Sequence, residues 1–263
     1  MSFWKSWFGR KSVDLVDSGK KPPYLEAKIE EWVDRLKPLA RDAWLPETVV
    51  HQAEHSSHTK FGGLPYLTQE SPWPQCPNCG DHMQLFLQFN LQDHPTKPEE
   101  GIIQLFYCTH SDPHCESDLE AFFPFSAAVV CRRVEYKGES LQVTPQIEEL
   151  FEEKRLNRWE HILDYPTAEE YDDLGLEQMD DEVGEWLYEN GYAATSGDKL
   201  GGWPLWIQGV EYPHNPQTGE VMQLLFQLDS EVNLPFMFGD SGVGHLTVSP
   251  NDEKLMAFGW ACY

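Results

Sequence analysis

Long apolar runs and basic residues are both scarce in this sequence. No stretch reaches the ~18 consecutive apolar residues of a membrane-spanning helix, so we expect no transmembrane span. A secretory leader is not recognisable, because the start, MSFWKSWFGRK, is aromatic and basic and lacks an apolar core. We expect residues 1–21 to form a tail, and weak peripheral contact of this tail with a membrane surface is left open.

A disulfide framework is also not expected. The six cysteines are spread over 263 residues and no export signal accompanies them, so thiols or metal ligands are the better interpretation. Together, the cysteine usage and the missing leader favour the cytoplasm as the location.

The scarcity of basic residues gives the chain a strongly acidic balance. Nineteen Lys and Arg stand against 44 Asp and Glu, which leaves a formal net charge of −25. Such a chain repels phosphate backbones, so we expect no nucleic-acid binding, whereas a basic polypeptide is attracted. The alternative is that the acidity only keeps the protein in solution.

The acidic residues are concentrated in the segment 164–192, which holds eleven of them and no Lys or Arg. Apolar residues recur within it at helical spacing, so we expect short amphipathic helices with an acidic outer face. Asn190-Gly191 is typical of a helix end. The predicted partner-binding residues of this face are Asp172, Asp173, Asp180 and Asp181.

The sequence repeats itself at an offset of 139 residues. KFGGLPYL at 60–67 returns as KLGGWPLW at 199–206, and HMQLFLQFN at 82–90 returns as VMQLLFQLD at 221–229. Twelve of the 31 positions from Lys60 to Asn90 are identical to their counterparts without a gap. We interpret this register as an internal duplication of one β-rich unit.

Four cysteines are confined to the first copy of the repeat. Cys76 and Cys79, in CPNCGD, align with Asn215 and Thr218, so the turn needs its Pro and Gly but not its cysteines. Cys108 lies in a further strand-like segment of the same copy, and a loop rich in ligand-type side chains follows it. A tetrahedral zinc site needs four such ligands, and we predict a structural one here. The predicted ligands are Cys76, Cys79, Cys108 and Cys115, with His110 and His114 as alternates.

The alternative to a zinc site is two pairs of reduced, half-buried thiols, because free cysteines often behave as small apolar residues. A closed four-cysteine site would be structural and would leave no open position for chemistry.

Hydrophobic periodicity predicts an α+β protein made of two similar β-rich halves. The segment 22–38 is predicted to be an amphipathic helix, and 144–163 a second one, opened by Thr144-Pro145. MQLFLQF, GIIQLFYC and FPFSAAVVCR are predicted strands, with equivalents in the second copy. The predicted boundaries are a tail (1–21), an N-terminal helix (22–38), a first β-rich repeat with the cysteines (39–135), an acidic helical connector (136–195) and a second β-rich repeat (196–263).

Glutamines recur in the repeat at positions that invite a binding role. The side-chain amide of glutamine both donates and accepts, so two halves carrying the same amides could line a cleft that binds an extended peptide. The alternative is that buried amides satisfy the backbone of a loop or bulge. The candidates are Gln84, Gln88, Gln223 and Gln227.

Asp240 is a further binding candidate. With Asp229 and Glu231 it offers carboxylates to a hard cation such as Ca²⁺, although the spacing lacks the EF-hand pattern.

Several of these motifs resemble a known family. KFGGLPYL, WPQCPNCGDHMQLFLQFNL, LLFQLDSEVNLPFMFGDSG and the terminal WACY resemble, in order, the YwqG-like bacterial family, a domain of unknown function. GGLPYL…CPNCGDHMQLFLQF…LFYC is also similar to the N-terminal half of programmed cell death protein two and its yeast ribosome-biogenesis relative.

The resemblance implies a duplicated domain with zinc-type cysteines at Cys76, Cys79 and Cys108, while Cys115 matches more loosely. The eukaryotic proteins act as dedicated chaperones of a basic ribosomal protein, and related bacterial genes have been suggested to serve as toxin-immunity or interaction modules. No catalytic residue is implied.

We therefore expect a non-catalytic interaction module, chaperone-like or immunity-like, that binds a basic protein such as a ribosomal protein or a toxin. One alternative is an enzyme acting on a small or peptidic substrate in the cleft between the repeats, where polar groups with shifted pKa values would have to converge. Another is a metal-responsive sensor, which would need a labile site.

Overall fold

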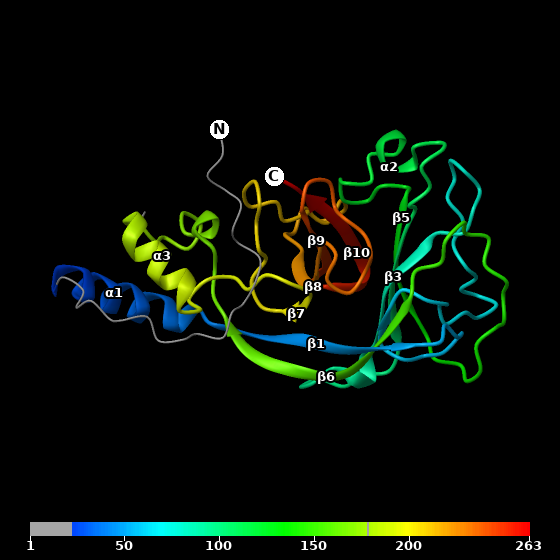
Figure 1. Cartoon of the computed structure of the whole chain (residues 1–263), viewed down its shortest axis with the longest axis horizontal. Coiled ribbons are helices and arrows are strands. Elements are labelled where there is room, and N and C mark those ends of the chain that lie inside the picture. The colour runs from blue at the N-terminus through cyan, green and yellow to red at the C-terminus, as the bar shows by residue number, and fades with distance from the viewer. Residues whose placement is uncertain (1–22, 178) are drawn as a thin grey trace.

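A single antiparallel sheet dominates the structure, a computed structural model that describes residues 23–177 and 179–263 (Figure 1). Within these residues its ten strands lie in the order β10-β9-β8-β7-β1-β6-β2-β3-β4-β5. The sheet curls until the outer strands β5 and β10 contact each other, which gives a nearly closed barrel. The strands are β1 (Arg41–His51), β2 (Lys60–Phe61), β3 (Gln84–Asn90), β4 (Ile102–Tyr107), β5 (Val129–Val134), β6 (Glu153–Asp164), β7 (Lys199–Gly201), β8 (Gln223–Asp229), β9 (Val243–Ser249) and β10 (Asp252–Ala261).

Three α-helices accompany the sheet within the described residues: α1 (Pro23–Leu36), α2 (Cys115–Asp118) and α3 (Asp181–Glu189). Short 3₁₀ turns, η1 (Lys37–Leu39), η2 (Leu91–Asp93) and η3 (Ala168–Glu170), complete the elements. None of the described helices is long and apolar enough to cross a bilayer. The coarse prediction of strands combined with an N-terminal helix is thus confirmed, and the aromatic and basic tail of residues 1–21 lies outside the described residues.

The predicted N-terminal helix is α1, and it packs beside α3 at one end of the molecule (Figure 1). Pro23 occupies its first position, where the missing N–H is harmless, and Pro38 follows its last turn. Trp32 of its apolar stripe stacks on Tyr171, with ring centroids 5.5 Å apart. Val183 and Leu187 of α3 belong to the same buried cluster, so the predicted amphipathic helix before Asn190-Gly191 is also confirmed.

The segment 144–163 is not a helix, so this prediction was wrong. Its second half is β6, which pairs with β1 over its whole length, from Arg41↔Asp164 to His51↔Glu153. Apolar spacing there is compatible with a helix, but a long partner strand satisfies every second backbone group of β6 and overrides local propensity. The connector 136–195 is therefore split by a central strand of the sheet.

The strands β1 and β6 cross between the two halves of the sheet. β6 pairs with β2 at Lys60↔Arg155, and β1 pairs with β7 at Ala43↔Gly201. The short strand of each half, β2 or β7, therefore pairs with a long strand from the other part of the chain. The apolar core spans both halves, because Phe61 and Phe226 contact each other in it at a centroid distance of 5.9 Å.

The repeated Lys-x-Gly-Gly motif anchors β6 at both ends. The ammonium of Lys60 lies 2.9 Å from the Glu153 carboxylate, and that of Lys199 lies 2.8 Å from Asp164. All four side chains are fully buried, and burial lowers the pKa of both lysines against the opposing effect of the carboxylates. Charges in such sites persist because they are paired and hydrogen-bonded.

Glycine is required beside each buried carboxylate. Gly63 and Gly202 have φ angles of +70° and +74°, and a Cβ at either position would overlap the carboxylate of Glu153 or Asp164. The second glycine of each motif therefore makes room for the acid that neutralises the lysine.

The same turn precedes β3 and β8. Gln75 bridges His82 in the first half, and His214 bridges Val221 in the second. The amide of Gly80 donates to the carbonyl of Cys76, and that of Gly219 donates to Asn215, both at 2.8 Å. The cysteine-bearing turn and its cysteine-free counterpart thus share one backbone geometry.

Strand β3 is buried on both faces, although polar and apolar residues alternate along part of it. A register shift between Leu85 and Leu87 interrupts its pairing with β4, and Gln84, Phe86 and Gln88 are as buried as the apolar residues. The strand is covered on both sides, so alternation carries no information about its orientation.

Candidate metal site and acidic groove

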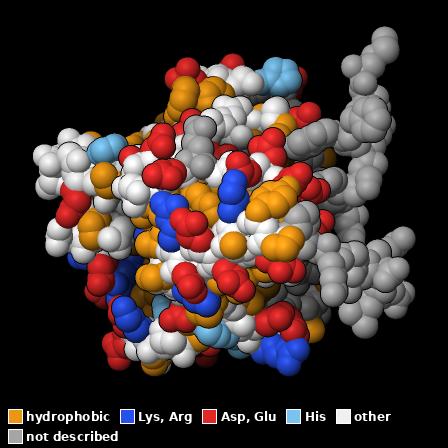
Figure 2. Space-filling view, turned by 90° about the vertical axis from the view of Figure 1, so that its left-hand side faces the viewer, with side chains coloured by type: hydrophobic (Ala, Val, Ile, Leu, Met, Phe, Trp, Pro, Cys, Tyr) orange, Lys and Arg blue, Asp and Glu red, His pale blue; other side chains and the backbone are white. Residues whose placement is uncertain are grey.

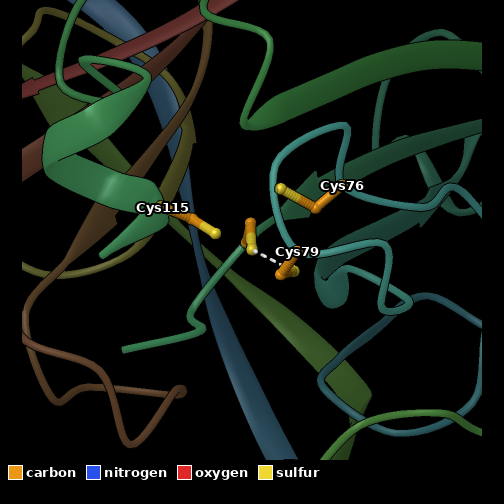
Figure 3. Close-up of side chains that lie close together, drawn as sticks. Cys76, Cys79 and Cys115 are labelled. Carbon is orange, nitrogen blue, oxygen red and sulfur yellow. Dashed lines mark hydrogen bonds between the residues drawn. The ribbon is translucent and has the colours of Figure 1, made fainter. Parts of the chain in front are cut away.

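Three separate segments bring four cysteines together (Figure 3). Cys76 and Cys79 lie in the turn before β3, Cys108 directly follows β4, and Cys115 opens α2. Their Sγ atoms all lie within 4.8 Å of one another, and those of Cys79 and Cys108 are 3.8 Å apart. The structure thus assembles the four residues that the spacing of the cysteines predicts.

The distances fit a metal site and not a disulfide. A tetrahedral site with Zn–S bonds of about 2.3 Å places its sulfur atoms about 3.8 Å apart, whereas a disulfide needs about 2.05 Å. All six cysteines are free thiols in the structure. The cluster could therefore hold a metal ion with four sulfur ligands.

The backbone positions the cysteines before any ion is considered. The N–H of Cys76 donates to the carbonyl of Asp81 at 2.9 Å, which closes the turn, and the N–H of Cys115 donates to Pro113 at 2.8 Å. The side chain of Asn78 lies over the cluster, with its amide nitrogen 3.5 Å from the sulfur of Cys115. The donor set is thus held by local structure on both sides.

The thiols differ in how readily they ionise. Burial raises the pKa of Cys115 to about 11 and raises that of Cys108 further. Burial also acts on Cys76, but hydrogen bonds from the backbone of Cys79 and Asn78 outweigh it, so the pKa of Cys76 is lowered. A cation at the centre would favour all four thiolates, because metal coordination deprotonates thiols.

The predicted alternates lie outside this group. The Nε2 atom of His110 lies 3.2 Å from the Asp81 carboxylate, and His114 is exposed before α2. Cys76, Cys108 and Cys115 are buried and Cys79 is half-buried, so four sulfur ligands would leave no open coordination position. Within the described residues, no other group of His, Cys, Asp or Glu gathers closely enough to hold a metal ion.

A groove of about 640 Å³ lies in the acidic segment, between η3 and α3. Asp172 and Asp181 line it, together with Glu169 and Glu185. The other two predicted face residues lie beside it: Asp173 is exposed, and Asp180 pairs with Lys28 of α1. Figure 2 shows carboxylates spread among apolar side chains on the end of the molecule that carries α1 and α3.

The lining of the groove includes four aromatic side chains and one residue with an unsatisfied polar atom. Tyr171, Tyr188, Tyr192 and Trp206 line it. Thr167 Oγ1 is buried in its wall without a hydrogen-bond partner. A groove of this kind suits an elongated ligand with a cationic end, because carboxylates attract the charge while tyrosine faces contact the stem.

The predicted glutamines do not lie together on an open surface. Gln88 accepts from the N–H of Tyr66 at 2.7 Å and donates to the carbonyls of Ser56 and His58, both at 2.8 Å. Gln227 makes the equivalent contacts to Leu205, Thr195 and Gly197. These two buried amides hydrogen-bond the backbone of neighbouring loops. This agrees with the alternative drawn from the sequence, that the amides satisfy a loop and do not line an open cleft.

The remaining binding candidates are scattered. Gln84 is buried and donates to the carbonyl of Glu149, whereas Gln223 and Asp240 are exposed. Asp229, which we grouped with Asp240, accepts from the N–H of Gly197 at 2.7 Å and from that of Ser230 at 2.8 Å.

Two features of the site region escaped the sequence analysis. The buried lysine–carboxylate pairs were missed, although a lysine repeated within an apolar motif is a signal for them. The groove itself was not predicted, although the acidic segment that forms most of its lining was.

A family model described as domain of unknown function (DUF1963) matches residues 59–263. The chain belongs to this family. The match begins just before the first Lys-x-Gly-Gly motif and covers the cysteine cluster, the acidic segment and both copies of the repeat. No curated protein is detectably similar to the chain in sequence.

Proposed function

We propose that this protein is a non-catalytic interaction module that binds a basic polypeptide in the acidic groove. The observation that supports this most is the groove itself, whose lining combines four carboxylates with four aromatic side chains in a chain of net charge −25. Long-range attraction would bring a basic partner to the surface, and the groove would hold its Lys or Arg side chains. Such binding weakens as salt screens it.

The role is chaperone-like or immunity-like, and the partner is a basic protein of the ribosomal or toxin type. This part of the proposal rests on the resemblance of the repeat motifs to the YwqG-like family and to the eukaryotic chaperone of a ribosomal protein. We place the module in the cytoplasm, in keeping with its free thiols.

We also propose that the two halves derive from duplication of one unit. In support of this, the offset of 139 residues relates the turns before β3 and β8, the buried lysines, the glycine pairs and the glutamine contacts. The cysteines belong to one copy, which suggests that the metal site was added to a turn that forms without it.

The metal is proposed to be zinc in a structural role. Four sulfur ligands suit Zn²⁺, and a closed site stabilises a loop without reacting. Metal analysis of the purified protein should find one zinc per chain. Cys115→Ser should reduce this content strongly, whereas Cys131→Ser, outside the cluster, should leave it unchanged.

The partner proposal is tested with charge-reversed variants at equal net charge. Asp172→Lys/Asp181→Lys reverses two charges in the lining of the groove. Glu139→Lys/Glu148→Lys reverses two charges at exposed positions outside the groove. Binding of a fluorescein-labelled deca-lysine peptide is followed by fluorescence anisotropy at about 50 and about 300 mM salt.

We expect the groove variant to weaken binding about tenfold at the lower salt concentration and the control variant to weaken it far less. Equal weakening by both variants would reduce the effect to overall charge and refute the groove as the binding site.

A further inference from the structure

The carboxylates that line the acidic groove are left without a basic partner by the described part of the chain. Glu169, Asp172, Asp181 and Glu185 take part in no ion pair among the described residues, and the segment 164–192 around them holds no Lys or Arg. Like charges gathered in one groove repel one another, so a cation brought to them is stabilising.

The basic side chains of α1 and of the turn after it, which lie on the side of α3, are already engaged. Lys28 and Lys37 each pair with an aspartate, and the guanidinium of Arg35 lies 4.5 Å from the centroid of the Trp32 ring. These cations are therefore not available to the groove.

The first eleven residues of the sequence, MSFWKSWFGRK, combine the two kinds of side chain that suit the groove. They hold three of the 19 basic residues of the chain, four aromatic residues and no acidic residue. The basic residues are Lys5, Arg10 and Lys11, and the aromatic ones are Phe3, Trp4, Trp7 and Phe8. Basic heads pair with carboxylates, while their stems and the neighbouring rings pack on the faces of tyrosine and tryptophan.

The chain leaves the described structure close to the groove. α1 begins at Pro23, and Lys28, about 7.5 Å further along the helix, contacts Asp180 at the start of α3. Asp181, the next residue, lines the groove. The intervening residues 12–22 span about 18 Å as a flexible chain and about 36–40 Å when fully extended, so residues 1–11 can reach the groove.

We propose that residues 1–11 occupy the acidic groove of their own chain and compete there with the basic partner. The docking stands on the charges and on the length of the connection, whereas the competition rests on the proposed function of the groove. A groove of about 640 Å³ receives a few side chains and not the whole segment.

A second cavity suits this segment less well. It lies beside the loop before β5, and one carboxylate, that of Glu211, lines it, against four in the acidic groove. Aromatic side chains line both, so the charge decides between them.

Because the segment is tethered, a weak contact is sufficient. A short flexible linker gives an effective concentration of about 1 mM, so a contact with a Kd of about 0.1 mM as a free peptide fills the groove for about nine-tenths of the time. A competing partner then binds about tenfold more weakly than to an open groove, because only the open fraction is competent.

Photo-cross-linking locates the segment directly. p-Benzoylphenylalanine replaces Trp7 in the full-length protein, which is irradiated at about 50 and about 300 mM salt, and the products are mapped by mass spectrometry. We expect cross-links to residues 167–194 at the lower salt concentration and few at the higher one. Asp172→Lys/Asp181→Lys should lose these cross-links, and the control Glu139→Lys/Glu148→Lys should keep them.

Cross-links to other parts of the fold, cross-links that join two chains, or cross-links that survive Asp172→Lys/Asp181→Lys would each overturn the proposal. Their absence, together with binding of the protein to vesicles of phosphatidylcholine and phosphatidylserine, would overturn it in favour of a membrane surface as the partner of the segment.

Competition is measured with the labelled deca-lysine peptide at the lower salt concentration. Lys5→Glu/Lys11→Glu reverses two of the three charges of the segment, and Lys97→Glu/Lys254→Glu makes the same change of charge at exposed positions outside it. We expect the first variant to bind deca-lysine about tenfold more tightly than the second. Equal affinities would overturn the competition.

The two experiments separate this inference from the proposed function. Cross-links in the groove, combined with deca-lysine binding that is unchanged by Asp172→Lys/Asp181→Lys, would refute the proposed function and leave the docking intact. Deca-lysine binding that depends on these two residues, without cross-links in the groove, would refute the docking alone.

Discussion

Gly63 illustrates how one residue can determine whether a buried charge is tolerated. Gly63→Ala would place a Cβ against the carboxylate of Glu153 at a φ of +70°. We expect this variant to lose more than about 3 kcal/mol of unfolding free energy, because backbone strain is joined by displacement of the acid that neutralises Lys60. Urea unfolding measures this loss.

Gly138→Ala provides the control for the strain alone. Gly138 has a φ of +89°, but nothing lies within 4 Å of its added Cβ, so we expect a loss of about 1–2 kcal/mol. Losses of equal size in the two variants would show that the buried ion pair does not depend on this glycine.

His245 should make the protein sensitive to acid. Burial, with Lys199 nearby, lowers the pKa of His245 from 6.5 to about 3 in the folded state. Below pH 6.5 the unfolded chain therefore takes up a proton that the folded chain does not, so stability present above pH 6.5 is lost as the pH falls toward 3. His245→Phe removes this contribution.

The measurement is urea unfolding of wild type and His245→Phe at pH 7 and pH 5. The wild type should lose about 2 kcal/mol more than the variant between these two values, since each pH unit below 6.5 contributes about 1.4 kcal/mol. Parallel losses would mean that the imidazole becomes protonated in the folded protein.

At the scale of elements, the cysteine cluster joins the turn before β3, the end of β4 and the start of α2. The counterpart turn before β8 folds with Asn215 and Thr218 in place of cysteines, so the metal is not needed for the turn. We therefore expect a chelator to increase amide hydrogen exchange in residues 108–128 while β1 and β6 stay protected.

Cys131→Ser is the control for this exchange experiment, because Cys131 lies outside the cluster. It should respond to the chelator as the wild type does, whereas Cys115→Ser should show fast exchange in 108–128 before any chelator is added. Global unfolding on chelation would assign the metal a role in forming the whole fold.

Strands β3, β4 and β5 and the pair Cys76 and Cys79 of the cysteine cluster were predictable because their signals are local. Runs such as MQLFLQF correspond to β3, and cysteines two residues apart in a turn are recognised without knowledge of the fold. β6 was taken for a helix because the partner that decides its conformation, β1, lies more than a hundred residues earlier. The sequence alone does not reveal such a partner.

The cavity of about 600 Å³ beside the loop before β5 could not be predicted for a related reason. His245, Trp206 and Phe122 are far apart in the sequence, and no motif relates them. The unpartnered Nε2 atom of His245 can be recognised only when every neighbouring donor and acceptor is known. Among the described residues, the two that hold a buried polar atom without a partner, Thr167 and His245, each belong to the lining of a different cavity.

At the scale of the whole molecule, the two halves depend on each other. β6 belongs to the C-terminal part of the chain but pairs with β2, and β1 belongs to the N-terminal part but pairs with β7. Lys60 is also neutralised by Glu153 of β6. The N-terminal half alone lacks the neighbour of β2 and the acid that neutralises Lys60, and the C-terminal half alone lacks the neighbour of β7.

This interdependence predicts the behaviour of a chain cut between Gly138 and Glu139, in an exposed connection. The fragment 1–138 would contain β1 without β6, and 139–263 would contain β6 without β1. We expect each fragment alone to lack cooperative unfolding, because its central strand has lost its main partner. In the fragment 1–138, the buried ammonium of Lys60 has also lost the Glu153 carboxylate. Mixed, the fragments should associate and recover the native NMR spectrum.

A protease site inserted at the same position is the control, since the nicked protein should stay folded as a two-chain complex. If the fragment 139–263 unfolds cooperatively on its own, then the second half is an independent domain and the crossed pairing of β1 and β6 only adds to its stability. If the fragments fold only together, the sheet is one cooperative unit, and the acidic groove should lose its ligand in the same transition.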